Sequence, residues 1–592
     1  MYMDFSNMGY SHVIDAILPQ LGRMDIGAIV KAFLVGVLVV LVMKLIKSLT
    51  ERSPYEYIPG PEPSSAFGYL LDMHKPDNLD FHFNMTERYG HVARLKGGLF
   101  GIASVGWAVH LRPFGVEFHT HSRSEYFSRV HGILWVGASY LRPGLALTNI
   151  AVSLFGIIHH GDGLASVWGN EHKKQRKLMN PVFTAAYVSK LTPLFYRIAN
   201  QLRARLTAQV KSGPVEMDIL DGLTRTALEL ISQGGMGHTF NSFDENSKEF
   251  SEFHEALKDV LPAASRLFYL LPYLESWRKI RPVWLRRTLA KIAYSLPWPS
   301  LRYFMNAVNT MHPVCARVFD EKRDALEKGG MEALASTTSG GRDLTTLLSE
   351  CARKVRRLNA ADTTSSLVQA NVEAEEQDRM PDEIVVANIS SIVLAGQETT
   401  SGAMSRLIDL MTSNPALQDW IREEISEALA KNNGEPLDYY ELNALPRLDA
   451  LCREALRLFA PVTFVWRQTM EDTLLPLQYP IKDLKTGQDV YEVFVQKGTA
   501  VYVGLSSTNR STTIWGPDAT EFKPERWIGR QAHESTVEQV KTPETVMSVL
   551  LPTFKFEKTK DVIDWRLGIT LSPYVRGREN EGPRVPMKVS LL

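Results

Sequence analysis

A long helical pattern in the middle of the chain is the feature that most constrains its fold. From Ile384 to Met411, apolar residues recur at the spacing of one helix that is largely buried. The residues just before it, Pro381, Asp382 and Glu383, are typical of a helix start, because proline fits the first turn and acids favour it. We therefore predict a long central helix around which the other elements pack.

One stretch of this helix, Ile392–Ser401, contains residues that weaken a helix interior. Gly396 costs about 1 kcal/mol relative to alanine there, and hydroxyl side chains compete for backbone carbonyls. We therefore expect a local bulge or kink, a feature often found at functional sites. Glu398 and Thr399 could then relay protons to a group bound against the helix. A strained core helix with Glu398 on a solvated face is the alternative.

Composition narrows the class of protein. The chain has 592 residues, of which 44% are hydrophobic, so it can bury a large core. Lysine plus arginine and aspartate plus glutamate both total 66, and we expect no nucleic-acid partner because no net positive field exists. Cys315, Cys351 and Cys452 are too few and too scattered for a disulfide framework or a structural zinc site.

The N-terminal segment, residues 1–50, predicts a membrane anchor. Residues 26–46 are apolar apart from Lys31 and Lys44, and a span needs about 20 such residues. An interfacial amphipathic helix is the alternative. Basic residues cluster after this run and acidic residues precede it, so the positive-inside rule places the rest of the chain in the cytosol. A single-pass anchor implies contact with a lipid bilayer.

The remainder divides into a linker and one large domain. Residues 51–63 are rich in proline, which favours a stiff, extended linker, and residues 64–592 are expected to form the domain. Two stretches of this domain are atypical. Residues 101–147 have no sustained periodicity, and residues 351–367 are polar and read as a flexible loop or an insertion.

Helical patterns dominate the domain, and short strand patterns occur near residues 461–467 and 499–505. The predicted fold is therefore mainly α with a small mixed β-sheet. Two helical segments carry charged side chains on one face. His172 and Arg176, at i and i+4, could grip carboxylates or phosphates, although a solvated basic face is the alternative. Glu454 and Arg457, at i and i+3, can form an ion pair.

These segments become specific as an ordered set. The chain contains HKKQR at 172–176, AGQETT at 395–400, EALR at 454–457 and PERW at 524–527. In this order and spacing they resemble the motifs of the cytochrome P-450 family, the heme-thiolate monooxygenases, and particularly its membrane-bound fungal members. The resemblance implies the cytochrome P-450 fold, with heme as cofactor and the endoplasmic reticulum as location.

The resemblance also implies roles for individual residues. Glu398 and Thr399 would be catalytic and would manage proton delivery during dioxygen activation, and Gly396 would allow the kink that makes room for it. The heme propionates would be bound by the basic residues His172, Arg176 and Arg467. A buried structural network would be formed by Glu454, Arg457 and Arg526.

The heme-ligand loop of the family is missing from this chain. Members hold the iron through a cysteine in a loop of the form Phe-x-x-Gly-x-Arg-x-Cys-x-Gly, and the thiolate favours O–O cleavage. No cysteine follows Trp527 in this sequence, so no metal ligand can be assigned. The loop and most of the helix after it are predicted to be lost between Pro543 and Glu544. An assembly error at segment boundaries is one hypothesis, and a degenerate paralogue is the other.

The predicted function follows from this resemblance. The lineage is that of a heme-dependent monooxygenase that hydroxylates or epoxidises an apolar small molecule, with electrons from an NADPH-dependent reductase in the same membrane. The chain as written is expected to be impaired, and whether it is an enzyme stays open. The alternative is a catalytically dead, membrane-tethered binder of apolar ligands, or a relic of the same fold. Heme retention distinguishes the two.

Overall fold

The computed structural model describes residues 35, 36, 39, 42, 43, 46, 53–62, 68–73, 75–96, 104–105, 147–148, 162–167, 169–179, 184–267, 283–295, 297–336, 380–529 and 542–592. Within them the fold is mainly helical with small β-sheets, as predicted. The predicted insertion at 351–367 lies outside the described residues, as does most of 101–147.

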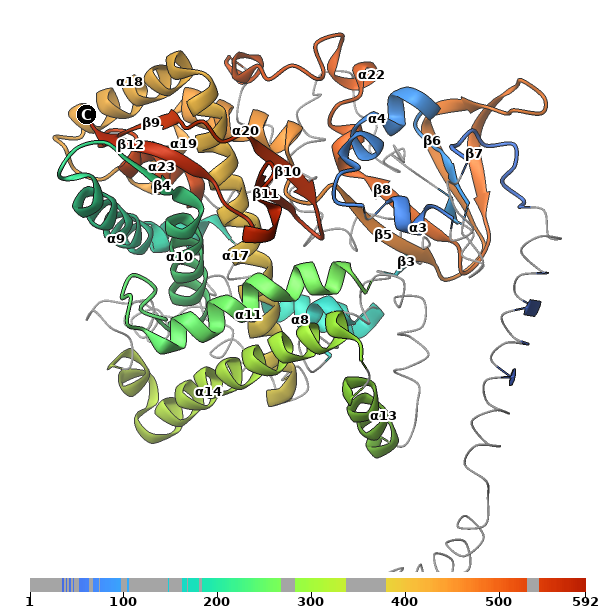
Figure 1. The fold of residues 1–592 in the computed structure, drawn as a ribbon, viewed down its shortest axis with the longest axis horizontal. Helices are drawn as coiled ribbons and strands as arrows, with labels where there is room; N and C mark the ends of the chain where they lie inside the picture. Colours follow the sequence, from blue (N-terminus) through green and yellow to red (C-terminus); the bar gives the residue numbers. More distant parts are fainter. Residues whose placement is uncertain are drawn as a thin grey trace, which may run out of the picture.

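The predicted central helix is α17, Asp382–Ser413, which runs through the middle of the molecule (Figure 1). Pro381 is its N-cap residue, and Asp382 and Glu383 occupy its first turn, where acids interact favourably with the helix dipole. The helix is α-helical from end to end. Its apolar residues are buried in two hydrophobic clusters, one around each half of the helix.

The first cluster lies around the N-terminal half of α17. It includes Val385, Ile389 and Val393 of α17, which pack with side chains from α11 and α14. The helices that contribute to or adjoin this region are α8 (Gly169–Met179), α11 (Lys248–Ser265), α13 (Val283–Ser295) and α14 (Pro299–Ser336).

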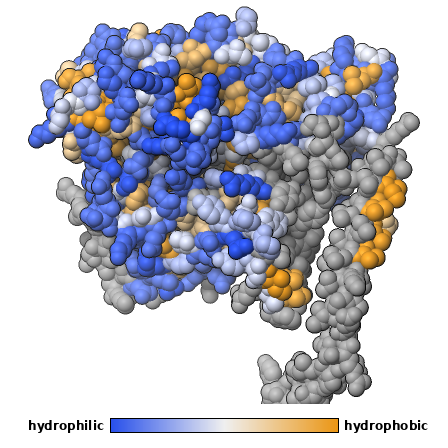
Figure 2. All heavy atoms as spheres, viewed as in Figure 1, coloured by the Kyte–Doolittle hydropathy of each residue, from blue (hydrophilic) through white to orange (hydrophobic). Residues whose placement is uncertain are grey.

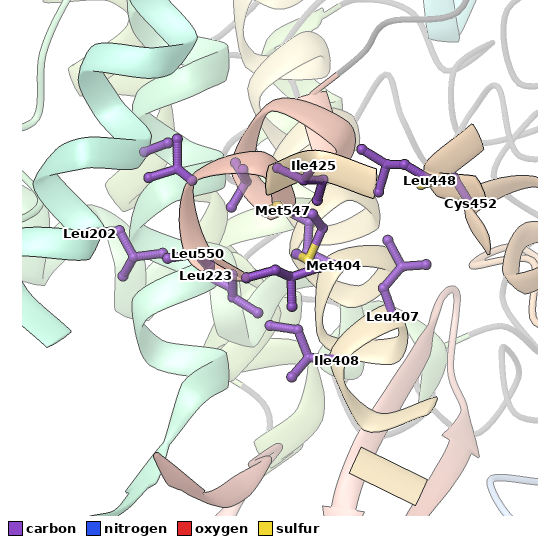
Figure 3. Packing of buried hydrophobic residues seen from close by; sticks show 14 of the residues in the cluster. Leu202, Leu223, Met404, Leu407, Ile408, Ile425, Leu448, Cys452, Met547 and Leu550 are labelled. Carbon is purple, nitrogen blue, oxygen red and sulfur yellow. The ribbon is translucent and has the colours of Figure 1, made fainter. Parts of the chain in front are cut away.

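The second cluster surrounds the C-terminal half of α17, where side chains from neighbouring helices converge (Figure 3). These helices include α9 (Ala185–Val210), α10 (Ile219–Ile231), α18 (Pro415–Lys431), α20 (Pro446–Leu458) and α23 (Thr542–Leu550). The residues labelled in the figure are Leu202, Leu223, Met404, Leu407, Ile408, Ile425, Leu448, Cys452, Met547 and Leu550. Although α23 is short, Val546, Met547 and Leu550 are fully buried, so it is firmly part of this core.

The largest sheet has five strands in the order β1-β2-β8-β5-β3 and is mixed, because β2 and β8 are parallel and the other pairs are antiparallel. Its strands are β1 (Arg94–Leu95), β2 (Ser104–Val105), β3 (Leu147–Thr148), β5 (Phe464–Thr469) and β8 (Ala500–Gly504). The described ends of the atypical stretch 101–147 therefore both belong to this sheet. The two strands that the sequence predicted are its β5 and β8.

The remaining described strands form three smaller antiparallel sheets. One is the hairpin of β6 (Thr473–Lys482) and β7 (Asp489–Val495), and another is the hairpin of β10 (Ile563–Leu567) and β11 (Leu571–Val575). The third joins β4 (Val215–Asp218), β9 (Phe554–Lys558) and β12 (Pro586–Leu591). Residues far apart in the chain thus share one sheet.

Short elements connect these parts. The short α-helices are α3 (Tyr69–Asp72), α4 (Leu79–Tyr89), α19 (Tyr439–Asn443), α21 (Leu505–Thr508) and α22 (Thr512–Trp515). The 3-10 turns are η1 (Leu164–Ser166), η5 (Pro524–Trp527) and η7 (Glu579–Glu581), and η3 (Ser232–Met236) is a π-helical turn.

In the proline-rich segment predicted as a linker, Tyr55 and Ile58 are buried against β6 and β7.

The predicted single-pass membrane anchor is contradicted by the structure. A membrane-spanning helix needs about 20 mostly apolar residues, and within the described ranges no helix is both long enough and apolar enough to cross a bilayer. The long α17, for example, carries Asn388, Gln397 and Glu398 along its length. Of the predicted span at 26–46, only Val35, Gly36, Val39, Val42, Met43 and Ile46 are described. The prediction of an anchored protein of the endoplasmic reticulum with a cytosolic domain is therefore corrected.

On the face seen in Figure 2, hydrophilic side chains cover most of the described surface, and hydrophobic ones lie in separate small patches. This distribution agrees with the two buried clusters inside. Burial of apolar surface stabilises a fold by about 25 cal/mol per Å², and here α17 contributes residues to both clusters.

Candidate functional site

Glu398 lies near the middle of α17 and turns its side chain towards the β10–β11 hairpin. Its carboxylate accepts hydrogen bonds from the hydroxyls of Thr570 and Ser572, and burial raises its pKa to about 7. The two hydrogen bonds favour the charged form and therefore limit the rise. An acid with a pKa near neutrality can both hold and release a proton at ordinary pH.

Thr399 occupies the next position on the helix. Its Oγ1 donates a hydrogen bond of 2.7 Å to the carbonyl oxygen of Ala395. Ala395 is exposed although its neighbours Val393 and Leu394 are buried. One face of the helix middle is therefore accessible to a ligand, and the Thr399 hydroxyl lies at that face.

Gly396 has a packing role that the sequence did not suggest. A Cβ atom at this position would lie 2.5 Å from Cδ1 of Ile231 in α10, a distance that real side chains do not reach. The expected bulge does not form, because α17 is continuously α-helical through Gly396, whereas the expected kink stays a prediction. The glycine instead lets α10 approach α17 closely. We expected hydroxyl side chains in this helix to compete for backbone carbonyls, and the hydrogen bond from Thr399 to the carbonyl of Ala395 is such an interaction.

His172, Arg176 and Arg467 form what we call the basic cluster. The first two lie on α8 and the third on β5, almost 300 residues later in the chain. The pKa of His172 is lowered by burial and then by the positive charges of Arg176 and Arg467, which places all three within electrostatic reach. Arg467 is buried, and burial lowers the pKa of its guanidinium. Like charges held together in this way favour an anionic ligand such as a carboxylate.

A pair of buried amides joins the helix of the basic cluster to the central helix, and the sequence gave no sign of it. Asn388 of α17 donates through Nδ2 to Oε1 of Gln175 at 3.1 Å, and its Oδ1 accepts from the backbone N–H of Leu164 at 2.7 Å. Gln175 Nε2 donates to the carbonyl of Asp162 at 2.8 Å. Because Asn388 and Gln175 are fully buried, these bonds fix α8 relative to α17.

Glu454, Arg457 and Arg526 are in direct contact, and with Trp527 they form what we call the acid-centred network. Nε and Nη2 of Arg457 each donate to a different oxygen of the Glu454 carboxylate at 2.8 Å. Arg526 Nε donates to Glu454 Oε1 at 2.9 Å. Trp527 Nε1 donates to Oε2 at 3.0 Å. The tryptophan follows Arg526 directly in the PERW motif, and its indole N–H is a contact that sequence reasoning missed.

The hydrogen bonds and charges of this network stabilise the charged form of the Glu454 carboxyl. Burial by itself would raise the pKa of the Glu454 carboxyl, but the hydrogen bonds and charge of Arg457, the backbone N–H of Lys523 and the guanidinium of Arg526 lower the pKa below its ordinary value. Nη1 of Arg457 also donates to the carbonyls of Asn509 and Ala519 at 2.7 and 2.6 Å. The buried charges therefore satisfy one another and tie α20 to the segment that ends in η5.

The described residues suit the propionate groups of a heme but provide no thiolate ligand for its iron. The basic cluster suits the two propionate groups. An axial thiolate is not available among the described cysteines. Cys315 of α14 is buried in the first cluster, where burial raises its pKa to about 11, and Cys452 of α20 is buried in the second. Cys351 lies outside the described residues. The helix α23 begins at Thr542, next to the predicted loss at Pro543 and Glu544.

Comparisons with known proteins agree on one family. The family model described as cytochrome P450 matches residues 149–543. This match begins just after the atypical stretch 101–147 and ends at the predicted loss. The chain is similar to cytochrome P450 monooxygenase 91 of Postia placenta, with 33% identity over 91% of this chain and 94% of that protein. It is also similar to the ganoderic acid synthetase CYP5150L8 of Ganoderma lucidum, with 29% identity over 91% of this chain and 95% of that protein.

Proposed function

The chain belongs to the cytochrome P450 family, and from this membership we propose that it binds heme through the basic cluster and descends from enzymes that oxidise apolar small molecules. Heme-dependent hydroxylation is the general activity of the family. The iron of a bound heme supplies the dioxygen chemistry, and the protein supplies binding, orientation and protons.

The observation that carries this proposal is the basic cluster. Two arginines and a histidine from two distant parts of the chain lie near one another at a partly buried position, where burial and the charges of Arg176 and Arg467 lower the pKa of His172. Holding like charges together costs free energy, which a pair of carboxylates would offset. His172, Arg176 and Arg467 are therefore proposed to bind the two heme propionates by charge-assisted hydrogen bonds.

Glu398 and Thr399 are proposed to handle protons beside the cofactor. The carboxyl of Glu398, with its pKa near 7, would hold or release a proton at neutral pH. The Thr399 hydroxyl, at the accessible face of α17, would pass or hold a proton at Oγ1. Gly396 supports both indirectly, because it sets the distance between α17 and α10.

The iron ligand is where this chain departs from its family. No cysteine follows Cys452 in the sequence, and the two described cysteines are buried in hydrophobic cores. We propose that the chain as written is impaired in catalysis. The missing ligand favours a second candidate function, an inactive binder of apolar ligands with the same fold.

The general requirements of the family set the remaining partners. We propose that the substrate of an intact version is an apolar small molecule, hydroxylated or epoxidised, and that electrons come from a redox partner such as an NADPH-dependent reductase. Buried charges are costly in a site, so an apolar substrate would bind away from the basic cluster and along the accessible face near Ala395 and Thr399.

Hemin titration of the full chain tests the proposed binding site. Soret absorption would be followed for the wild type, for Arg467→Met, and for Arg447→Met as a matched control on the remote surface pair with Glu423. Loss of one charge-assisted hydrogen bond costs about 1.5–3 kcal/mol, so Arg467→Met should weaken hemin binding about 10- to 100-fold and Arg447→Met should not. Equal affinities in all three proteins, or no hemin binding by the wild type, would contradict the proposal.

Sequencing the native transcript across the codons for Pro543 and Glu544 decides between the two candidate functions. An additional segment that encodes a cysteine in a glycine-rich loop would show that the intact protein is a monooxygenase. Its reduced, carbon-monoxide-bound form should then have the absorption of a thiolate-ligated heme. A transcript that matches the present sequence would favour the inactive binder.

A further inference from the structure

One face of the C-terminal half of α17 contacts the β10–β11 hairpin at several positions. Residues 398, 402, 406 and 409 are separated by four, four and three positions, so they lie on one side of the helix. Each of them meets the hairpin. Glu398 accepts hydrogen bonds from Thr570 and Ser572, and the position of a Cβ at Gly402 would lie 3.7 Å from the carbonyl oxygen of Leu571.

The other two positions anchor the hairpin further along the helix. Asp409 Oδ2 accepts a hydrogen bond of 3.0 Å from Nε1 of Trp565 in β10. The guanidinium of Arg406 lies 4.4 Å from the centroid of the Trp565 ring and 3.8 Å from that of Phe459, so it is held between two aromatic rings. Arg406 Nη1 also donates to Asp409 at 3.1 Å.

The register of the hairpin determines which groups reach Glu398. Leu571, Pro573 and Val575 are buried on one side of β11, and side chains alternate along a strand. Ser572 and Tyr574 therefore lie on the other side, and Thr570, just before the strand, bonds the same carboxylate as Ser572. Trp565 pairs with Pro573 and Leu567 with Leu571, so an anchor at Trp565 fixes the position of the strand opposite it.

We propose that the β10–β11 hairpin, anchored on α17 through Trp565, positions the Glu398 carboxyl by means of the Thr570 and Ser572 hydroxyls. Thr570 and Ser572 are positioning residues and act through Glu398. This inference rests on the proposed proton-handling role of Glu398, but the contact itself can be tested without a functioning enzyme.

Other charged and titratable groups near this contact are few among the described residues. They are Tyr574 of β11, whose pKa is raised by burial and then by the charge of Glu398, and the cations Arg566 of β10 and Arg266 at the end of α11, which lower the pKa of that tyrosine. The two hydroxyls are the groups that stabilise the charged carboxylate directly.

The test follows the titration of Glu398 in the full-length protein. The carboxyl stretching band that Glu398→Gln abolishes would be recorded by infrared difference spectroscopy as a function of pH. The wild type should titrate near pH 7. The double variant Thr570→Val, Ser572→Ala removes both donors to the carboxylate, so its midpoint should rise by about one pH unit.

Ser401→Ala is the matched control. Ser401 is buried and its hydroxyl donates to the backbone carbonyl of Glu398 at 3.2 Å, not to the carboxylate, so the midpoint should stay at the wild-type value. An unchanged midpoint in the double variant, or an equal shift in Ser401→Ala, would overturn the proposal. Ser572→Ala alone should give a smaller rise, which keeps the test available if the double variant does not fold. Because the readout needs neither heme nor turnover, its failure is distinct from failure of the proposed function.

Discussion

Two groups of charged side chains in the described part of the chain, the acid-centred network and the basic cluster, are built in opposite ways. In the acid-centred network, one carboxylate, Glu454, receives hydrogen bonds from Arg457, Arg526 and Trp527. In the basic cluster, the three members carry or acquire the same sign of charge, and Arg176 and Arg467 disfavour protonation of His172. The first group brings opposite charges into direct contact, whereas the second is the proposed site for an anionic ligand. On our proposal, this difference distinguishes a structural network from a ligand-binding site.

Removing the carboxylate from the acid-centred network should have the largest effect. Glu454→Ala leaves Arg457 and Arg526 without their shared counter-ion, and breaking a buried ion pair by deleting one partner costs about 3–5 kcal/mol of unfolding free energy. Urea denaturation followed by circular dichroism measures this. Glu423→Ala is the control, because the exposed Glu423–Arg447 pair should contribute less than about 1 kcal/mol. Similar losses of unfolding free energy in Glu454→Ala and Glu423→Ala would show that the buried network stabilises the fold no more than an ordinary surface pair.

Glu398 adds a titrating charge to the comparison. Its pKa is raised by burial from 4.5 in the unfolded chain to about 7 in the fold, so the folded protein binds the proton more tightly. The free energy of unfolding should therefore fall by about 3 kcal/mol as the pH rises from about 4.5 to about 7. Glu398→Gln should remove this slope. Denaturation curves at a series of pH values check it, and an unaltered slope in the variant would contradict the predicted burial of the charge.

The indole donor of the acid-centred network should have a smaller effect. Trp527→Phe keeps the ring but deletes the Nε1 hydrogen bond to Glu454, and a hydrogen bond to a charged group contributes about 1.5–3 kcal/mol. The same substitution in a Glu454→Ala background should cost clearly less, because the acceptor is already absent. Additive losses in this double-mutant cycle would show that Trp527 stabilises the fold independently of Glu454.

Stability should respond least to a change in the basic cluster. Arg467→Met removes a buried like charge and keeps an apolar stem, so the unfolding free energy should change by less than about 1 kcal/mol. The pKa of His172 should rise towards its ordinary value of 6.5, because one of the charges that lowers it is gone. Proton NMR of the histidine ring measures this pKa. A large loss of stability would place Arg467 in the structural framework and not in a ligand site.

Much of the helical framework could be predicted from the sequence. The pattern over 384–411 gave α17 within a few residues at each end. The spacing of apolar residues predicts a helix correctly here because the buried side of a helix repeats about every 3.6 residues. The β6–β7 and β10–β11 hairpins were not predicted, because their partners and burial depend on contacts with distant segments.

Parts of the site were accessible in the same way, and parts were not. His172 and Arg176 share a helix face by spacing alone, whereas the position of Arg467 beside them depends on how β5 enters the sheet. The alternation of Thr570, Ser572 and Tyr574 was visible in the sequence as hydroxyls at a period of two, but nothing in it indicated Glu398 as their partner. The N-terminal anchor was predicted from hydropathy and is contradicted among the described residues.

The sequence by itself determined the family, the central helix and the charged motifs, because these depend on residue type and local spacing. It also determined that no cysteine follows Cys452 to ligate an iron. The tertiary structure decided that Glu454, Arg457 and Arg526 meet in one buried network and that Arg467 lies near His172 and Arg176. It also showed that Gly396 allows the close packing of Ile231 in α10 against α17. Such properties arise from contacts between segments hundreds of residues apart, and burial changes the free energy of a charge only once those contacts exist.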